Sequence, residues 1–198
     1  GIGRLMDLLR AEGLERDTLV VFTSDNGGER FSDNWPLVGG KMDLTEGGIR
    51  VPWIAHWPAV IAPGSTSTQT CMTMDWSATM LDAAGAPAAA SHPLDGRSLM
   101  PLLRDATWRN DQPLFWRMNH RGQRAMRHGP WKYLRVDGHD YLFNLEGDER
   151  ERANLARIAP ERLAARVQAW EAWEATMPPI PADATVSLGY GAKDMPQR

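Results

Sequence analysis

The first residues of the chain alternate between apolar and polar positions with the period of a helix. Ile2, Leu5 and Leu9 fall on one face, and Gly13 follows where helices commonly end in a left-handed conformation. Residues 18–23 then form a short apolar run rich in β-branched side chains, which is typical of a strand buried on both faces of a parallel sheet. A helix, a short loop and a buried strand in this order predict an α/β sheet.

The middle of the chain predicts one further strand and one further helix. Residues 51–57 resume a strand-like run after a stretch that is broken by glycines. Asp75 can cap a short helix through Ala84, and Gly85 can close that helix. Both elements extend the α/β pattern.

Later residues change in character to short alternating strands. Segments 124–136 and 141–145 are strand-like, and the pair Asp137-Gly138 between them suits a hairpin turn. Pro160 then begins an amphipathic helix that can cover one face of this layer. The apolar face of the helix consists of Leu163, Val167, Trp170 and Trp173. This part of the chain is therefore expected to form a separate antiparallel layer.

Composition limits the classes of protein to consider. A chain of 198 residues and 22.1 kDa can form one substantial core, or a main core with a small appended layer. A formal net charge of −3 argues against a general nucleic-acid binder. No apolar run approaches the length that crosses a bilayer, and the first residues read as a helix rather than a signal peptide. The localisation stays open between the cytoplasm of a bacterium and the periplasm or exterior.

Polar residues follow the first predicted strand, at the edge where open α/β sheets usually keep their sites. The side-chain oxygens of Asp25 and Asn26 suit calcium or magnesium, and the two glycines that follow let adjacent side chains converge. Zinc is not expected, because the chain has no paired Cys or His motif at zinc spacing. Taken alone, Asp-Asn-Gly-Gly is more often a plain turn.

Several short motifs surround this pair and extend over nearly the whole chain. They are Thr23-Ser-Asp-Asn-Gly27, Gly39-Gly-Lys41, Glu46-Gly-Gly-Ile-Arg-Val-Pro52, Asp95-Gly-Arg-Ser-Leu99, Arg127-His-Gly-Pro-Trp-Lys-Tyr133, Leu142-Phe-Asn-Leu145 and Asn154-Leu-Ala156. Together they resemble the formylglycine-dependent, arylsulfatase-like sulfatases of the alkaline phosphatase superfamily.

The resemblance implies a fold and a domain plan. Residues 1–112 are expected to be the carboxyl-terminal part of an alkaline-phosphatase-like α/β sheet domain. Residues 113–198 are expected to form a small antiparallel sheet with a carboxyl-terminal helix, followed from Pro178 by an extended surface tail.

The resemblance also implies an activity, the hydrolysis of a sulfate ester with release of inorganic sulfate. Asp25 and Asn26 correspond to two ligands of a calcium ion, with magnesium as the alternative metal, and Lys41 corresponds to the catalytic lysine that contacts the sulfate group. Charge grows on the sulfate oxygens and on the leaving oxygen during sulfuryl transfer, so a cation and an ammonium group stabilise that state. The substrate, which could be a sulfated carbohydrate, an aryl sulfate or another ester, is not readable from these residues.

The nucleophile of the family is a formylglycine made from the cysteine of a Cys-x-Pro-x-Arg motif. Cys71, the one cysteine of the chain, is followed by Met72, Thr73 and Met74 and does not match, so it is interpreted as a small buried hydrophobe and forms no internal disulfide. We expect the formylglycine in an amino-terminal portion of the same enzyme, which would be a partner of this chain. The 198 residues alone are then expected to be inactive.

Further residues are weaker candidates. His120 and Trp35 could contact the substrate, Trp35 by stacking on a sugar ring. Glu46 and Arg50 could support the metal site or form a structural ion pair that fixes their loop. The basic stretch 117–135 could attract an anionic substrate or form a solvated strand face.

Two other functions remain open. A phosphatase or phosphonate monoester hydrolase of the same superfamily would tend to carry Asp-His where this chain has Asp25-Asn26. A non-catalytic module could instead present the basic stretch to a sulfated polymer. Such a module would leave the retention of Asp25, Asn26 and Lys41 unexplained.

Overall fold

The computed structural model describes residues 1–29 and 31–184 of the chain. It contains two compact units, of which the first consists of residues 1–25 and 51–111. The second consists of residues 26–50 and the chain from residue 112 onward. Segment 26–50 thus belongs with the carboxyl-terminal part, while the expected domain boundary between residues 112 and 113 stays a prediction.

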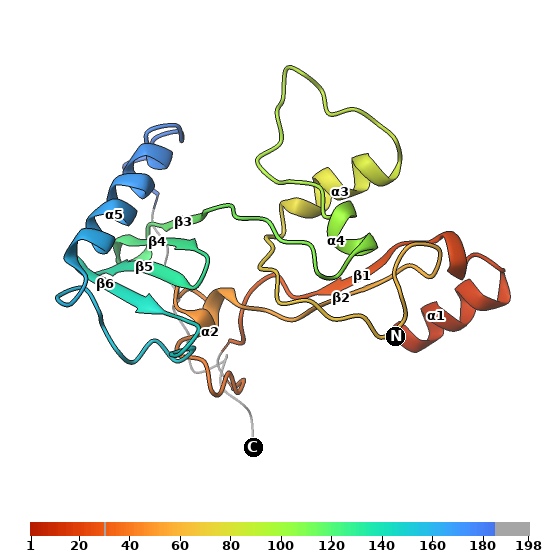
Figure 1. Ribbon diagram of the computed structural model, residues 1–198, viewed down its shortest axis with the longest axis horizontal. Helices are drawn as coiled ribbons and strands as arrows, with labels where there is room; N and C mark the ends of the chain where they lie inside the picture. The colour runs from red at the N-terminus through yellow and green to blue at the C-terminus, as the bar shows by residue number, and fades with distance from the viewer. Residues whose placement is uncertain (30, 185–198) are drawn as a thin grey trace. The chain divides into compact units, whose positions relative to one another are not determined.

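In the first unit, the elements at the start of the chain form as expected, but the strand pairs differently. Helix α1 (Ile2–Ala11) and the short helix η1 (Glu15–Asp17) precede β1 (Val20–Thr23). Within the described residues β1 pairs with β2 (Trp53–His56), and the pair is antiparallel rather than parallel (Figure 1).

The strand β1 is also not buried on both faces. Leu19, Val21, Trp53 and Ala55 pack on an apolar cluster, whereas Phe22 and its cross-strand partner Ile54 point away from it and are 49% and 62% exposed. The prediction of a doubly buried parallel strand was therefore wrong for the described residues. A run of apolar, β-branched residues specifies an extended strand but neither the direction of its neighbour nor what covers its second face.

Two helices complete this cluster. They are α3 (Asp75–Ala83), close to the predicted helix, and α4 (Met100–Arg104). The Asp75 carboxylate accepts hydrogen bonds from the backbone N–H groups of Met72 at 2.8 Å and Arg97 at 2.9 Å. It thereby ties the start of α3 to the loop before α4. A Cβ atom at Gly96 would lie 2.2 Å from the Met74 carbonyl oxygen, which explains the glycine in Asp95-Gly-Arg.

Cys71 packs beside the same cluster, and burial together with nearby Asp75 raises the pKa of its thiol to about 12. The thiolate is the reactive form. We therefore expect Cys71 in the folded chain to react with iodoacetamide at pH 8 about 1,000-fold more slowly than in the chain unfolded in guanidinium chloride. The rate of alkylation, followed by mass spectrometry, tests this. Equal rates in the two states would show that the thiol is accessible.

The second unit contains a four-stranded antiparallel sheet of order β3-β4-β5-β6. Its strands are β3 (Leu114–Met118), β4 (Gln123–His128), β5 (Trp131–Val136) and β6 (His139–Asn144), and η2 (His120–Gly122) joins the first two. The predicted hairpin turn at Asp137-Gly138 is present, with positive φ angles of 49° and 82°. The predicted strand 124–136 is two strands, because the chain turns at Gly129 with a φ of 57°.

The two faces of this sheet are covered by different segments. The predicted helix from Pro160 is α5 (Pro160–Glu174), and it lies along one face of the sheet (Figure 1). On this face Trp170 packs with Met126 and Tyr133. On the other side, Leu44 packs with Ala125, Leu134, Phe143 and Leu145. Leu44 precedes α2 (Glu46–Ile49), so the sheet anchors segment 26–50 through an apolar contact next to α2.

No helix in the described part of the chain is long and apolar enough to cross a membrane. The expected surface tail begins at Pro178, and its residues 185–198 lie outside the described residues.

Candidate active site

The predicted metal-binding pair lies where β1 ends. Asp25 follows the strand by two residues and is exposed. Asn26 is partly buried, and its Nδ2 donates a hydrogen bond to the carbonyl oxygen of Gly27 at 2.8 Å. This hydrogen bond restrains the plane of the amide. The other polar atom of the side chain, Oδ1, is an oxygen, which is the type of ligand that calcium prefers.

The backbone after Asn26 is packed against two other stretches of segment 26–50. The N–H of Gly27 donates to the Gly48 carbonyl oxygen at 2.9 Å, and the N–H of Lys41 donates to the Gly28 carbonyl oxygen at 3.0 Å. The N–H of Gly47 donates to the Val38 carbonyl oxygen at 2.8 Å. The motifs Asn-Gly-Gly, Gly-Gly-Lys and Glu-Gly-Gly therefore form one hydrogen-bonded arrangement, which we call the glycine cluster (residues 26–28, 38–41 and 46–48).

Glycine is required in this cluster because backbones touch there. A Cβ atom at Gly27 would lie 1.7 Å from the Gly47 carbonyl oxygen, and one at Gly48 would lie 2.0 Å from that of Asp43. Backbone atoms cannot move aside as a flexible side chain can.

Asn34 fastens the same cluster, and the sequence reasoning missed it. Its Oδ1 accepts from the N–H of Gly28 at 3.0 Å, and its Nδ2 donates to the carbonyl oxygens of Gly28 at 3.1 Å and Gly39 at 2.9 Å. One side chain thus holds both the loop after Asn26 and the loop before Lys41. A lone Asn in a loop gives no sequence signal for this role.

The side chain of Lys41 lies at the surface of this arrangement. Its Nζ is 3.2 Å from Oε2 of Glu29, and the side chain is 38% exposed. Lys41 is therefore neither buried nor remote from Asn26, since the backbone N–H of Lys41 is bonded to Gly28. An ion pair of this exposure is weak and readily exchanged for another anion.

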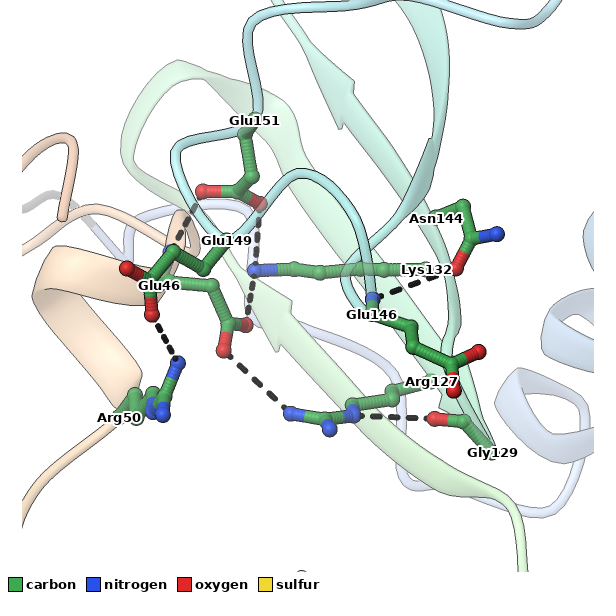
Figure 2. Close-up of polar contacts among 9 residues, drawn as sticks. All are labelled: Glu46, Arg50, Arg127, Gly129, Lys132, Asn144, Glu146, Glu149 and Glu151. Carbon is green, nitrogen blue, oxygen red and sulfur yellow. Dashed lines mark hydrogen bonds and ion pairs between the residues drawn. The ribbon is translucent and has the colours of Figure 1, made fainter.

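Glu46 lies in a buried ion cluster that also contains Lys132, Arg127 and Glu151 (Figure 2). Nζ of Lys132, which is fully buried, lies 2.9 Å from Oε1 of Glu46 and 2.8 Å from Oε1 of Glu151. Nη1 of Arg127 lies 3.3 Å from Oε2 of Glu46. Burial is the main cause of a raised pKa of Glu151, and the nearby charge of Lys132 opposes that shift.

The contacts of Glu46 and Arg50 agree with the ion-pair interpretation, and a role of either residue in supporting the metal site stays a prediction. Each forms a structural ion pair, Glu46 with Lys132 and Arg127, and Arg50 with Glu149 at 3.4 Å. They do not pair with each other in these contacts.

The basic stretch 117–135 is largely compensated by carboxylates and aromatic rings. Besides Lys132 and Arg127, the contacts are Arg117 with Glu174, Arg121 with Asp137, Arg135 with Asp140, and Arg124 over the ring of Trp170. For Lys132 both interpretations of the stretch, a substrate-attracting charge and a solvated face, were wrong, because its side chain is fully buried.

The two weaker substrate-contact candidates lie in exposed or half-buried positions of the second unit. Trp35 is 72% exposed, and the guanidinium carbon of Arg150 lies 4.1 Å from its ring centroid. One face of the indole is thus covered by a cation. His120 is half-buried in η2, and its carbonyl oxygen accepts a hydrogen bond from Nε2 of Gln123 at 3.2 Å. A role of either residue in substrate binding stays a prediction.

The donor set fits calcium or magnesium in kind. Among the described residues no group of three or more His, Cys, Asp or Glu side chains could hold a metal ion. Asp25 and Asn26 offer hard oxygen donors, and calcium takes about six to eight of them. Further ligands would therefore have to come from other groups.

Comparison with known proteins agrees with these motifs. The model of a protein family described as Sulfatase matches residues 1–86. The chain belongs to the sulfatase family. It is 40% identical over 121 residues to a steryl-sulfatase of Mus musculus, an alignment that covers 56% of this chain and 19% of that protein. It is 32% identical over 188 residues to a sulfatase of Formosa agariphila, with 81% of this chain and 34% of that protein covered.

Solved structures that are similar to this chain confirm the expected fold class. Ps i-CgsB, crystallised in complex with k-i-k-neocarrahexaose, matches with a TM-score of 0.81 and 31% identity over 87% of this chain and 40% of its own. A phosphonate monoester hydrolase of Agrobacterium radiobacter matches with a TM-score of 0.59 and 25% identity over 87% of this chain and 37% of its own. This sulfatase-family chain spans well under half the length of each protein that it matches here.

Proposed function

We propose that this chain is part of a sulfatase that hydrolyses a sulfate ester and releases inorganic sulfate. The observation that carries the proposal is the glycine cluster, in which the backbone of Lys41 is hydrogen-bonded to Gly28, two residues from Asn26. An ammonium group and a metal-binding amide on bonded loops form a suitable arrangement for an anionic group. Membership of the sulfatase family supports a sulfate ester as that group.

Each proposed site residue has a distinct role. Asp25 and Asn26 would hold a calcium ion, or magnesium as the alternative, through a carboxylate and an amide oxygen. When bound, the metal would supply positive charge beside the sulfate oxygens. Lys41 would exchange its weak contact with Glu29 for the sulfate group and stabilise the charge that grows during transfer. Cys71, with its raised pKa, is proposed to have no part in catalysis.

For the finer identity of the substrate we propose a sulfated carbohydrate. Ps i-CgsB, which is similar over most of this chain, was crystallised with k-i-k-neocarrahexaose. The exposed indole of Trp35 is the type of group that stacks on a sugar ring. The similarity to a steryl-sulfatase of Mus musculus keeps another sulfate ester as the alternative substrate.

The alternative of a phosphonate monoester hydrolase is less well supported. The hydrolase of Agrobacterium radiobacter is similar in fold, but its TM-score of 0.59 is below the 0.81 of Ps i-CgsB. Asn26 supplies an amide oxygen rather than the imidazole that zinc and manganese commonly take. A non-catalytic polymer-binding module gains no support from the basic stretch, because its charges are largely compensated.

Replacing Lys41 tests the proposal in the full-length enzyme. We expect Lys41→Ala to lower the kcat for an aryl sulfate by about 100- to 1,000-fold, since one preorganised charge stabiliser is lost. Lys41→Arg should restore only part of the activity, because a planar guanidinium differs in shape from an ammonium. Arg4→Ala, a change of an exposed cation on α1, is the matched control. Full activity of Lys41→Ala would show that Lys41 is a surface residue without a catalytic role. If the wild-type enzyme hydrolysed phosphonate esters but not sulfate esters, the phosphonate monoester hydrolase would be favoured.

A further inference from the structure

Lys132 is a charged side chain in a place where charge is costly. Its exposed fraction is zero, and removing an ammonium group from water costs several kcal/mol unless partners compensate it. The buried ion cluster supplies them, since two cations (Lys132, Arg127) face two carboxylates (Glu46, Glu151). An apolar residue would fill the same space without this requirement, so the cluster calls for an explanation other than burial.

The contacts converge on one residue, Glu46 (Figure 2). Its Oε1 accepts from Nζ of Lys132 at 2.9 Å, and its Oε2 accepts from Nη1 of Arg127 at 3.3 Å. Its own backbone N–H donates to Oε2 of Glu151 at 2.7 Å. Lys132 lies between the two carboxylates and holds both. Glu46 is thereby fixed at both ends, by its side chain and by its main chain.

Glu46 is directly bonded to the part of the glycine cluster that supports the site. Gly47 donates its N–H to the Val38 carbonyl oxygen at 2.8 Å, and the Gly48 carbonyl oxygen accepts from the N–H of Gly27 at 2.9 Å. Gly27 follows Asn26, and Val38 lies in the loop that leads to Lys41. A shift of Glu46 would therefore disturb the hydrogen bonds that hold the loop after Asn26 and the loop before Lys41.

We propose that Lys132 is a positioning residue of the active site. It fixes the first turn of α2, which we call the Glu46–Gly48 turn, and through this turn it fixes the loops that carry Asn26 and Lys41. This rests on the proposed function, because it concerns the same site. The ammonium group has three donors and can hold both carboxylates at once, which a methionine of similar length cannot. The ion cluster then acts on the site through backbone hydrogen bonds and touches no substrate.

The test compares Lys132→Met with Lys132→Arg in the full-length enzyme. Arg135→Met is the matched control, because Arg135 lies on the same strand but pairs with Asp140, at the half-exposed end of β5. The first measurement is hydrogen exchange by mass spectrometry, on peptides that contain the N–H groups of Gly27 and Gly47 and on peptides of α5. The second is the calcium concentration that gives half-maximal activity.

We expect Lys132→Met to accelerate exchange at Gly27 and Gly47 while exchange in α5 stays at the wild-type rate. The half-saturating calcium concentration should rise by about 10- to 100-fold, as for other residues that support a metal site from behind. Lys132→Arg should fall between the wild type and Lys132→Met, and Arg135→Met should match the wild type in both measurements.

Other outcomes would overturn the proposal. Equal acceleration in α5 and at the glycines, or a loss of thermal stability with an unchanged calcium dependence, would show that Lys132 acts on overall stability alone. If Lys132→Met fails to fold, Glu151→Gln replaces it in the test. This substitution keeps an acceptor for the Glu46 N–H but removes one negative charge beside Lys132. Unchanged hydrogen exchange at Gly27 and Gly47 in Glu151→Gln would refute the proposal. Absence of sulfate release by the wild type would refute the proposed function and leave the exchange result interpretable.

Discussion

Replacing Asp25 by alanine in the full-length enzyme is expected to abolish sulfate ester hydrolysis and to leave the protein folded. Asp25 would supply the charged ligand of the proposed metal site, and loss of the metal removes the charge that stabilises the transferring group. The expected fall in kcat is at least about 100-fold. Asp25 is exposed and follows β1 by two residues, so its removal leaves no cavity in the core.

Calcium dependence separates a ligand from a residue that only shapes the loop. Asp25→Asn should keep one oxygen donor and recover a fraction of the activity when calcium is raised, whereas Asp25→Ala should not. Asp7→Ala, which removes a highly exposed carboxylate from α1, is the control and should behave as the wild type. Near-wild-type turnover of Asp25→Ala at saturating calcium would remove Asp25 from the metal site.

Local patterns were sufficient to predict α1, α3, α5 and the hairpin, whereas the short helices α2 and α4 were not predicted. The spacing of apolar residues predicted α1 and α5, and the turn pair Asp137-Gly138 predicted the connection of β5 to β6. In each case the information lies within a few residues, since helix period and turn chemistry are local properties.

Pairing between distant segments was not predictable in the same way. The apolar run at β1 did not reveal that β2 lies antiparallel to it, and no local signal assigned residues 26–50 to the second unit. The burial of Lys132 depends on Glu46, the first residue of α2, and on Glu151, in the loop after β6, and neither residue is a neighbour of Lys132 in sequence. A charge that is balanced by distant partners looks like a surface charge when only its neighbours in sequence are considered.

The candidate site was predicted through motifs rather than through physical patterns. Asp25, Asn26 and Lys41 were selected because their motifs resemble the sulfatase family, and the glycine cluster gives a physical reason for the spacing of these motifs. Asn34 lies in no such motif, although its side chain bonds two of the three stretches of the cluster. Only the structure could show its role.

Gly27→Ala is expected to disrupt the site more than a Gly→Ala substitution at any other glycine of the cluster. The added Cβ would lie 1.7 Å from the carbonyl oxygen of Gly47 and 2.9 Å from the Cα of Gly48, both of which are backbone atoms. To relieve this overlap, the loop after Asn26 must separate from the Glu46–Gly48 turn and lose the hydrogen bond from Gly27 to Gly48. Overpacking of this kind costs about 3 kcal/mol or more, because the surrounding backbone cannot relax.

Gly3→Ala is a matched control for this substitution in the same full-length enzyme. Gly3 lies within α1, and apart from its chain neighbours and the backbone of its own helix no heavy atom lies within 4 Å of a Cβ at that position, so the change should stabilise the helix slightly. Thermal unfolding and the half-saturating calcium concentration are the two measurements. We expect Gly27→Ala to weaken calcium binding even at temperatures where the protein stays folded, since Asn26 is the neighbouring residue. A variant with normal calcium dependence and normal stability would mean that the Glu46–Gly48 turn does not support the loop of Asn26.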